Sequence, residues 1–137
     1  MFQQPRQNPA IVVVEDDPVL SVVLQRLIRK LTQHYEVIHV SDGMAALKQF
    51  ELGPVPLVIT DYHLMASIDG LKLTDRIRER WPETRIVLIT AYATPDVEAA
   101  AYAHNVEFYL PKPFLLGDLE QIVRGLLNEL QSQERGS

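Results

Sequence analysis

Short apolar runs alternate along this chain with stretches of helical periodicity, and this alternation constrains the fold more than any other feature of the sequence. Each run is three or four residues long and rich in β-branched residues, without strict alternation of apolar and polar positions. Such runs are typical of strands that are covered on both faces of a sheet. They occupy residues 11–14, 37–40, 57–60, 86–89 and 108–110.

A helix is predicted after each of these runs. In residues 18–31 and 119–130 the apolar side chains recur every three or four positions, which draws one apolar stripe along a helix. Turn or cap residues, an Asp-Gly or a Thr-Pro pair, open the other three helices. These helices are predicted over residues 43–52, 70–80 and 94–104.

Strict alternation of strand and helix predicts an α/β fold, with one five-stranded parallel sheet, right-handed crossovers and helices on both faces. The length of 137 residues suits a single domain. We place this domain at residues 10–130 and expect residues 1–9 and 131–137, which continue neither pattern, to be flexible tails.

Composition and charge exclude several classes of protein. The chain has no cysteine, so disulfides, thiolate metal sites and cysteine nucleophiles are excluded. A net charge of −5 argues against binding to nucleic acid phosphates. The apolar runs are far shorter than the roughly 20 residues of a membrane helix, and residues 1–9 lack the apolar segment of a secretory signal. We therefore expect a soluble cytoplasmic domain that binds neither nucleic acid nor membrane.

Polar residues that could carry chemistry follow four of the five predicted strands. In an open parallel sheet, ligands bind outside the carboxyl ends of the strands, so residues at these positions are candidates for chemistry. They are Glu15, Asp16 and Asp17 after the first run, Asp61 after the third, Thr90 after the fourth and Lys112 after the fifth.

Crowding of the acids points to a metal ion. Bringing Glu15, Asp16 and Asp61 together is unfavourable, because like charges a few ångströms apart raise one another's pKa. A hard divalent cation resolves this conflict, and the oxygen ligands suit Mg²⁺, with Mn²⁺ as a substitute. Lys112 and Thr90 would then bind an anion beside the metal. Carboxylates, a metal and a lysine predict a phosphoryl-transfer site rather than an acyl-transfer site.

Several of these residues also have a simpler interpretation. Asp17, which precedes a proline, is better explained as a helix cap, and Asp69, which precedes a glycine, as a turn and cap residue. Thr90 taken alone would be a strand former. Three histidines without metal-ligand spacing are interpreted as ordinary surface or core residues, namely His34, His39 and His104.

The chain resembles the receiver domain of two-component response regulators over nearly its whole length. The matching motifs are residues 11–18 (IVVVEDDP), 58–61 (VITD), 69–70 (DG), 88–91 (LITA) and 110–114 (LPKPF). Five motifs in this order, at the ends of predicted strands, make a specific match. The resemblance implies a flavodoxin-like, doubly wound fold with strand order 2-1-3-4-5. It also implies a signalling domain that catalyses only its own phosphorylation and dephosphorylation.

The resemblance assigns roles to individual residues. It implies that Asp61 accepts a phosphoryl group from a histidine kinase or a histidine phosphotransfer protein. Glu15 and Asp16 would hold Mg²⁺ with Asp61, and the main-chain carbonyl of His63 would be a further ligand. His63 and Tyr92 flank the approach of water in this family, so they would tune the lifetime of the phosphoryl group.

Further roles concern the phosphoryl oxygens and the switch. The resemblance implies that Lys112, the Thr90 hydroxyl and the Ala91 amide bind phosphoryl oxygens, and that the Lys112-Pro113 bond is cis. Thr90 and Tyr109 would move on phosphorylation. The face made by the fourth helix, the last strand and the last helix would then change its preference for a downstream effector protein or domain, or form a phosphorylation-linked dimer.

The loop after Asp61 departs from the family pattern. The usual Met-Pro is missing from residues 62–68, and Gly70 comes nine residues after Asp61, where the family has eight. We expect the extra residue to bulge near residues 66–67, to make the loop more mobile, and to leave the His63 carbonyl in place.

Other interpretations stay open on sequence alone. A dinucleotide-binding module would need a glycine-rich or hydroxyl-rich first loop, whereas the acids at 15–17 repel phosphate. A phosphatase of the haloacid dehalogenase type needs an Asp-x-Asp motif at the first strand end, which is missing here. The chain could also be a phosphorylation-independent scaffold, or the N-terminal fragment of a larger regulator.

Overall fold

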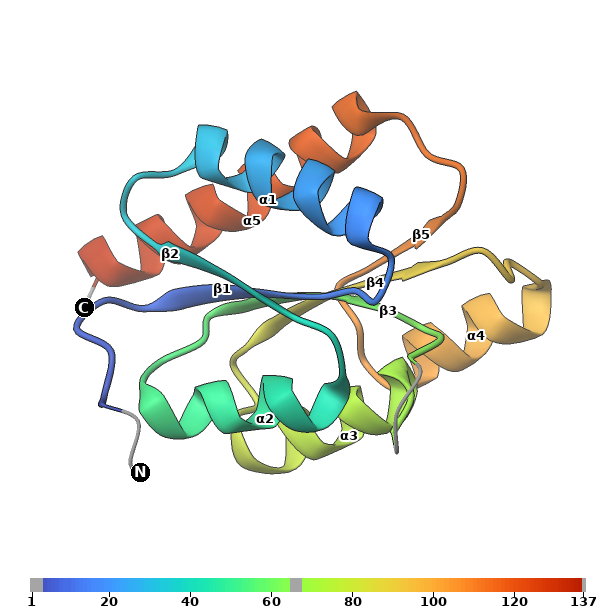
Figure 1. The fold of residues 1–137 in the computed structure, drawn as a ribbon, viewed down its shortest axis with the longest axis horizontal. Helices are drawn as coiled ribbons and strands as arrows, with labels where there is room; N and C mark the ends of the chain where they lie inside the picture. The colour runs from blue at the N-terminus through green and yellow to red at the C-terminus, as the bar shows by residue number, and fades with distance from the viewer. Residues whose placement is uncertain (1–3, 65–67, 137) are drawn as a thin grey trace.

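The predicted parallel sheet and its strand order are confirmed. Within residues 4–64 and 68–136, which the computed structural model of this chain describes, five parallel strands pair in the order β2-β1-β3-β4-β5 (Figure 1). The strands are β1 (Ala10–Val14), β2 (Glu36–Val40), β3 (Leu57–Asp61), β4 (Arg85–Thr90) and β5 (Phe108–Pro111).

Helices cover both faces of this sheet, as the doubly wound fold requires. Helices α1 and α5 lie on one face, and α2, α3 and α4 lie on the other (Figure 1). Their bounds are α1 (Pro18–Leu31), α2 (Gly43–Leu52), α3 (Gly70–Arg80), α4 (Pro95–Ala103) and α5 (Leu116–Gly136). None of the helices in the described ranges is both long and apolar enough to cross a membrane.

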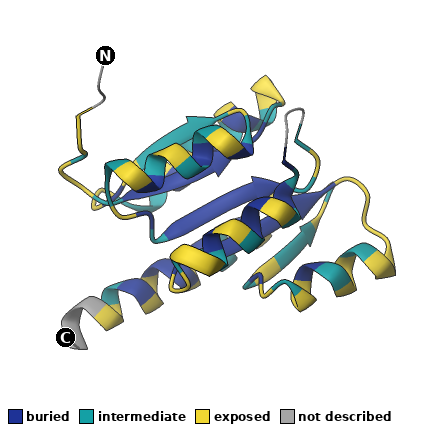
Figure 2. Ribbon diagram, turned by 90° about the horizontal axis from the view of Figure 1, so that it is seen from below, coloured by how far each residue is buried: buried dark blue, intermediate teal, exposed yellow. Residues whose placement is uncertain are grey.

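The unbroken apolar runs fill two cores at once. Ile11 and Val13 of β1 pack into the core beneath α1 and α5, whereas Val12 and Val14 pack into the core beneath α2, α3 and α4. Successive side chains of a strand point to opposite faces, so a strand buried on both faces needs apolar residues at every position. Figure 2 shows the result, with buried central strands between helices whose outer sides are exposed.

Asp17 and Asp69 cap helices, as predicted. The Asp17 carboxylate accepts hydrogen bonds from the Val19 and Leu20 amides at 2.9 and 3.2 Å, and the Asp69 carboxylate accepts from the Lys72 amide at 2.8 Å. Both residues satisfy donors at a helix N-terminus that have no partner within the helix.

Both segments predicted as tails contain residues that contact or extend the fold. Arg6 donates to the Gln49 side chain and to the carbonyls of Gly53 and Pro54, so it binds the C-terminal end of α2. Helix α5 continues to Gly136, past the last residue of its apolar stripe. Gln, Glu and Arg in this last stretch are good helix formers, which extends the helix where the apolar pattern has ended.

Gly70 allows α3 to begin directly against the strand that carries Asp61. Its amide donates to the Tyr62 carbonyl at 2.8 Å. A Cβ atom at this position would lie 2.5 Å from the Asp61 carbonyl oxygen and 3.0 Å from the Tyr62 Cα. Both of these atoms belong to the main chain and cannot rotate away, so this position requires glycine.

We predict that Gly70→Ala destabilises the protein by about 1–3 kcal/mol, because the new methyl group forces the main chain of α3 away from β3. Gly125→Ala is the matched control, since a Cβ at this α5 position meets nothing within 4 Å. This control should stabilise the protein by about 0.5–1 kcal/mol through higher helix propensity. Urea unfolding measures both changes. Equal stability of Gly70→Ala and the wild type would contradict the close approach.

Candidate functional site

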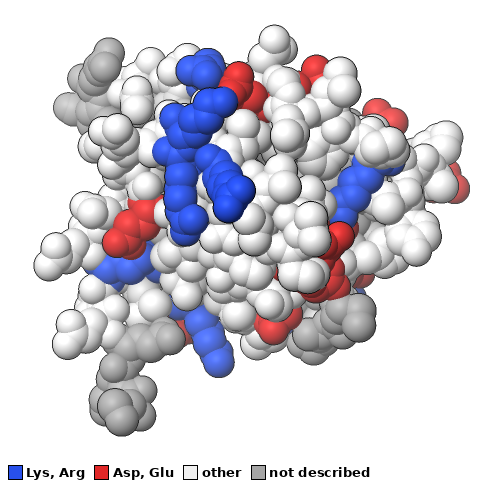
Figure 3. All heavy atoms as spheres, turned by 45° about the horizontal axis from the view of Figure 1, so that its top comes forward, with Lys and Arg blue, Asp and Glu red and all other residues white. Residues whose placement is uncertain are grey.

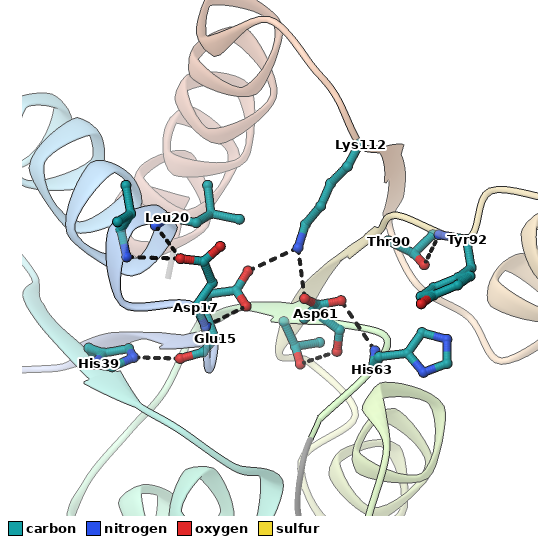
Figure 4. Close-up of polar contacts among 11 residues, drawn as sticks. Glu15, Asp17, Leu20, His39, Asp61, His63, Thr90, Tyr92 and Lys112 are labelled. Carbon is teal, nitrogen blue, oxygen red and sulfur yellow. Dashed lines mark hydrogen bonds and ion pairs between the residues drawn. The ribbon is translucent and has the colours of Figure 1, made fainter.

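Three carboxylates and one ammonium group meet at the carboxyl edge of the sheet. Glu15 and Asp16 follow β1, Asp61 ends β3, and Lys112 follows β5. One oxygen from each acid lies within 4.8 Å of the others. The Lys112 Nζ lies 2.8 Å from Asp61 Oδ2 and 3.2 Å from Glu15 Oε1 (Figure 4). The sequence-based prediction that these residues converge is therefore confirmed.

Glu15 and Asp61 are buried, which is unusual for acids. They are 1% and 7% exposed, because β1 and β3 lie in the interior of the sheet, whereas Asp16 is more open to solvent. The main-chain amide of Lys112 donates to the Thr90 carbonyl at 2.7 Å, which ties the start of the β5–α5 loop to the end of β4. This bond holds the lysine over the two acids.

Burial and charge shift the pKa values within this cluster. Burial, and then the neighbouring Asp61 charge, raises the pKa of Glu15 from 4.5 to about 7, against the opposing effect of the Asp17 amide and Lys112. Burial alone would lower the pKa of Lys112. Its hydrogen bonds to Asp61 and Glu15 and their charges outweigh burial, so the pKa of Lys112 is raised.

The donor set fits a hard divalent cation. Glu15, Asp16 and Asp61 offer carboxylate oxygens, which are the ligands that Mg²⁺ and Mn²⁺ prefer. A single ammonium group cannot balance three acids, so a cation would offset the repulsion from Asp61 that adds to burial in raising the pKa of Glu15. The His63 amide donates to Asp61 Oδ1 at 3.2 Å, which places the His63 main chain beside the cluster.

Thr90 and Tyr92 lie beside the acids without touching them. The buried Thr90 hydroxyl accepts a hydrogen bond from the Tyr92 amide at 2.9 Å, and it points toward Tyr92 rather than Asp61 (Figure 4). The Tyr92 ring is 62% exposed and stands edge-on to the His63 ring, with 4.4 Å between the ring centroids. These two aromatic rings form one wall at the mouth of the site.

Tyr109 lies away from the acids, on the edge strand β5. Its ring is partly buried and packs against the core beneath α2, α3 and α4. Its hydroxyl is buried and has no hydrogen-bond partner among the described residues. A buried hydroxyl without a partner costs about 1–3 kcal/mol, so this position of the ring is not an optimal one.

Two expectations that came from the resemblance concern the loops around the site. The Lys112-Pro113 bond is cis, which confirms the first of them. The bulge expected near residues 66–67 lies outside the described residues. The Gly70 amide donates to the Tyr62 carbonyl, which joins the start of α3 to the residue that follows β3.

Sequence reasoning missed two contacts made by histidines. His39 Nε2 lies 2.7 Å from the Glu15 carbonyl oxygen, and His104 Nδ1 lies 2.5 Å from Asp75 Oδ1. Both partners are distant in sequence, so spacing along the chain held no signal for either contact. His39 is the more consequential of the two, because its partner belongs to the acid cluster.

Comparison with known proteins decides the family. A sequence model of the response regulator receiver domain matches residues 11–124 of this chain. The chain belongs to the response regulator receiver domain family. This confirms the resemblance and makes the domain a phosphorylatable signalling module of two-component systems.

Relatives of this receiver domain include both short and long proteins. The response regulator receiver protein CpdR of Brucella abortus is 30% identical over 85% of this chain and 95% of its own length. The transcriptional regulator NtrC of Proteus hauseri is 28% identical, and the sensor histidine kinase GacS of Pseudomonas protegens is 31% identical, each over 94% of this chain. The chain spans only 27% of NtrC and 15% of GacS.

Solved structures of receiver domains superpose closely on this one. The signal receiver domain of an HD domain-containing protein from Pseudomonas fluorescens has a TM-score of 0.80 at 28% identity, and the match covers 92% of this chain and 99% of that chain. The Mn²⁺-bound form of response regulator Rcp1 has a TM-score of 0.70 at 26% identity, over 86% of this chain and 91% of that chain.

The raised pKa of Glu15 predicts how stability changes with pH. The folded protein holds this proton more tightly than the unfolded chain, so the contribution to stability is complete below pH 4.5 and is lost as the pH rises through about 7. Without divalent cations, the free energy of unfolding of the wild type should fall by about 2 kcal/mol relative to Glu15→Gln between about pH 5 and about pH 8.

Urea unfolding of both proteins across this pH range measures the effect. Added Mg²⁺ should restore stability at about pH 8 in the wild type and much less in Glu15→Gln. Parallel pH profiles for the two metal-free proteins would contradict the assignment of the raised pKa to Glu15.

Proposed function

We propose that this receiver domain accepts a phosphoryl group on Asp61 in a Mg²⁺-dependent reaction, with a histidine kinase or a histidine phosphotransfer protein as donor. One observation carries the proposal: the Asp61 carboxylate lies where two further acids and the Lys112 ammonium converge. Membership of the receiver family supports the same role.

Asp61 acts as the nucleophile in this proposal. One of its carboxylate oxygens forms a bond to phosphorus as the phosphorus–nitrogen bond of the donor phosphohistidine breaks, and the electron pair of that bond stays on the donor imidazole. Glu15, Asp16 and Asp61 would hold Mg²⁺, with the His63 carbonyl as a further ligand. The bound ion would supply positive charge to offset the charge of the transferred group.

Lys112 and Thr90 stabilise the product of this reaction. Lys112 already donates to Asp61 Oδ2, so its ammonium can move to a phosphoryl oxygen without crossing the site. The Thr90 hydroxyl must turn from the Tyr92 amide to reach the phosphoryl group, where the Ala91 amide is the second donor. The Tyr109 hydroxyl has no hydrogen-bond partner among the described residues. The change at the end of β4 would therefore allow the Tyr109 ring to reorient.

Two surfaces fit the partners of such a domain. The first two turns of α1 expose Val19 and Val22, and the entry into α5 exposes Leu115 and Leu116; these apolar side chains suit docking of a phosphodonor protein. Figure 3 shows Lys and Arg side chains gathered on the side of the molecule formed by α1 and α5.

The α4-β5-α5 face, with exposed Tyr102 and Phe108, suits a downstream effector or a second phosphorylated copy.

The acceptor is tested by treating the protein with acetyl phosphate and Mg²⁺. The wild type should gain the mass of one phosphoryl group, and Asp61→Asn should gain none, because an amide oxygen is a poor nucleophile. Asp17→Asn is the matched control, since Asn caps a helix as well as Asp does and Asp17 has no role in transfer. Intact-protein mass spectrometry reads all three. Equal labelling of Asp61→Asn and the wild type would contradict the assignment.

Tyr92 should lengthen the lifetime of the aspartyl phosphate, because its ring stands with His63 at the mouth of the site and hinders the approach of water. We predict that Tyr92→Ala loses its phosphoryl group several-fold faster than the wild type. Tyr102→Ala, which removes an exposed tyrosine from α4, should decay at the wild-type rate. The decay is followed after removal of the phosphodonor, and equal rates for Tyr92→Ala and the wild type would refute this role.

A further inference from the structure

Two residues of the edge strand β2 form hydrogen bonds with the main chain of Glu15. The Glu15 amide donates to the Val40 carbonyl at 3.1 Å, and the Glu15 carbonyl lies 2.7 Å from His39 Nε2 (Figure 4). A carbonyl oxygen only accepts hydrogen bonds, so the His39 imidazole must carry a hydrogen on Nε2. The last two residues of β2 therefore fix both polar main-chain groups of Glu15.

The carbonyl that His39 binds belongs to the peptide unit between Glu15 and Asp16. This peptide unit is planar, so fixing its oxygen also fixes the direction in which the chain leaves Glu15 and enters Asp16. The oxygen lies beyond the last residue pair of the β1–β2 ladder, Val14 and Val40. Among the main-chain hydrogen bonds that the described residues form outside regular helices and strands, none goes to this oxygen. The imidazole supplies the hydrogen bond that the sheet does not.

Repulsion among the acids makes this bond important. Like charges push Glu15 and Asp16 away from Asp61, and a rotation of the peptide unit that joins them would relieve this repulsion. A half-buried imidazole that grips this unit opposes the rotation and keeps both carboxylates directed toward Asp61. Groups that orient the ligands of a metal site typically change its affinity by tenfold or more when they are removed.

We propose that His39 is a positioning residue for the Mg²⁺ site, which holds the peptide unit between Glu15 and Asp16 through its Nε2–H. This inference rests on the proposed function, because it assigns His39 to the metal site of that function. It adds a side chain from the edge strand β2 to a site whose other residues end or follow β1, β3, β4 and β5.

The test is calorimetric titration of the full chain with Mg²⁺. His39→Leu, which cannot donate, should weaken Mg²⁺ binding by about tenfold. His39→Gln, which carries an amide N–H at a similar distance from the main chain, should restore most of the affinity. His104→Leu is the matched control: it removes an imidazole bonded to Asp75 at the opposite edge of the sheet, and it should bind Mg²⁺ like the wild type.

The outcomes separate this inference from the proposed function. Equal Mg²⁺ affinity in His39→Leu and the wild type overturns the inference alone, as does equal weakening in His39→Gln and His39→Leu, which indicates packing. A wild type that binds no Mg²⁺ overturns both. A second measurement needs no variant: nitrogen NMR of the metal-free wild type should show a hydrogen on His39 Nε2, and a neutral ring protonated only on Nδ1 overturns the inference.

Discussion

The Lys112 ammonium holds two buried carboxylates at the edge of the sheet, 2.8 Å from Asp61 and 3.2 Å from Glu15. One cation serves three acids there, because Asp16 belongs to the same cluster. Burial, and then the charge of Asp61, raises the pKa of Glu15, and the surplus negative charge makes the site receptive to a divalent cation. In the proposed reaction, the same lysine would pair with a phosphoryl oxygen once a cation has neutralised the carboxylates.

The fold keeps these charges together by means of contacts far from the chemistry. Gly70 lets α3 begin against the main chain of Asp61, and His39 grips the main chain of Glu15 from the edge strand. The end of β5 is tied to the end of β4 through the Lys112 amide. The charged residues are therefore held by contacts with neighbouring strands, so a change of charge at Asp61 can be passed on to β4 and β5.

The sequence allowed prediction of the features that depend on local pattern. Strands buried on both faces and helices with one apolar stripe are visible in the order of residues, and so are the acids and lysine at strand ends. Strand order came from family resemblance rather than from periodicity. Contacts of Arg6 and His39 could not be predicted, because each joins residues brought together only by folding. The end of α5 was misplaced because its apolar stripe stops before the helix does.

The most direct test of this account is a crystal structure of the protein with Mg²⁺ and beryllofluoride, which mimics a phosphoryl group on a carboxylate. We expect a beryllofluoride adduct on Asp61, a metal ion bound by Glu15, Asp16 and Asp61, and the Lys112 ammonium in contact with the adduct. An unmodified Asp61, with Glu15 and Asp16 turned away from it and no metal between them, would contradict it.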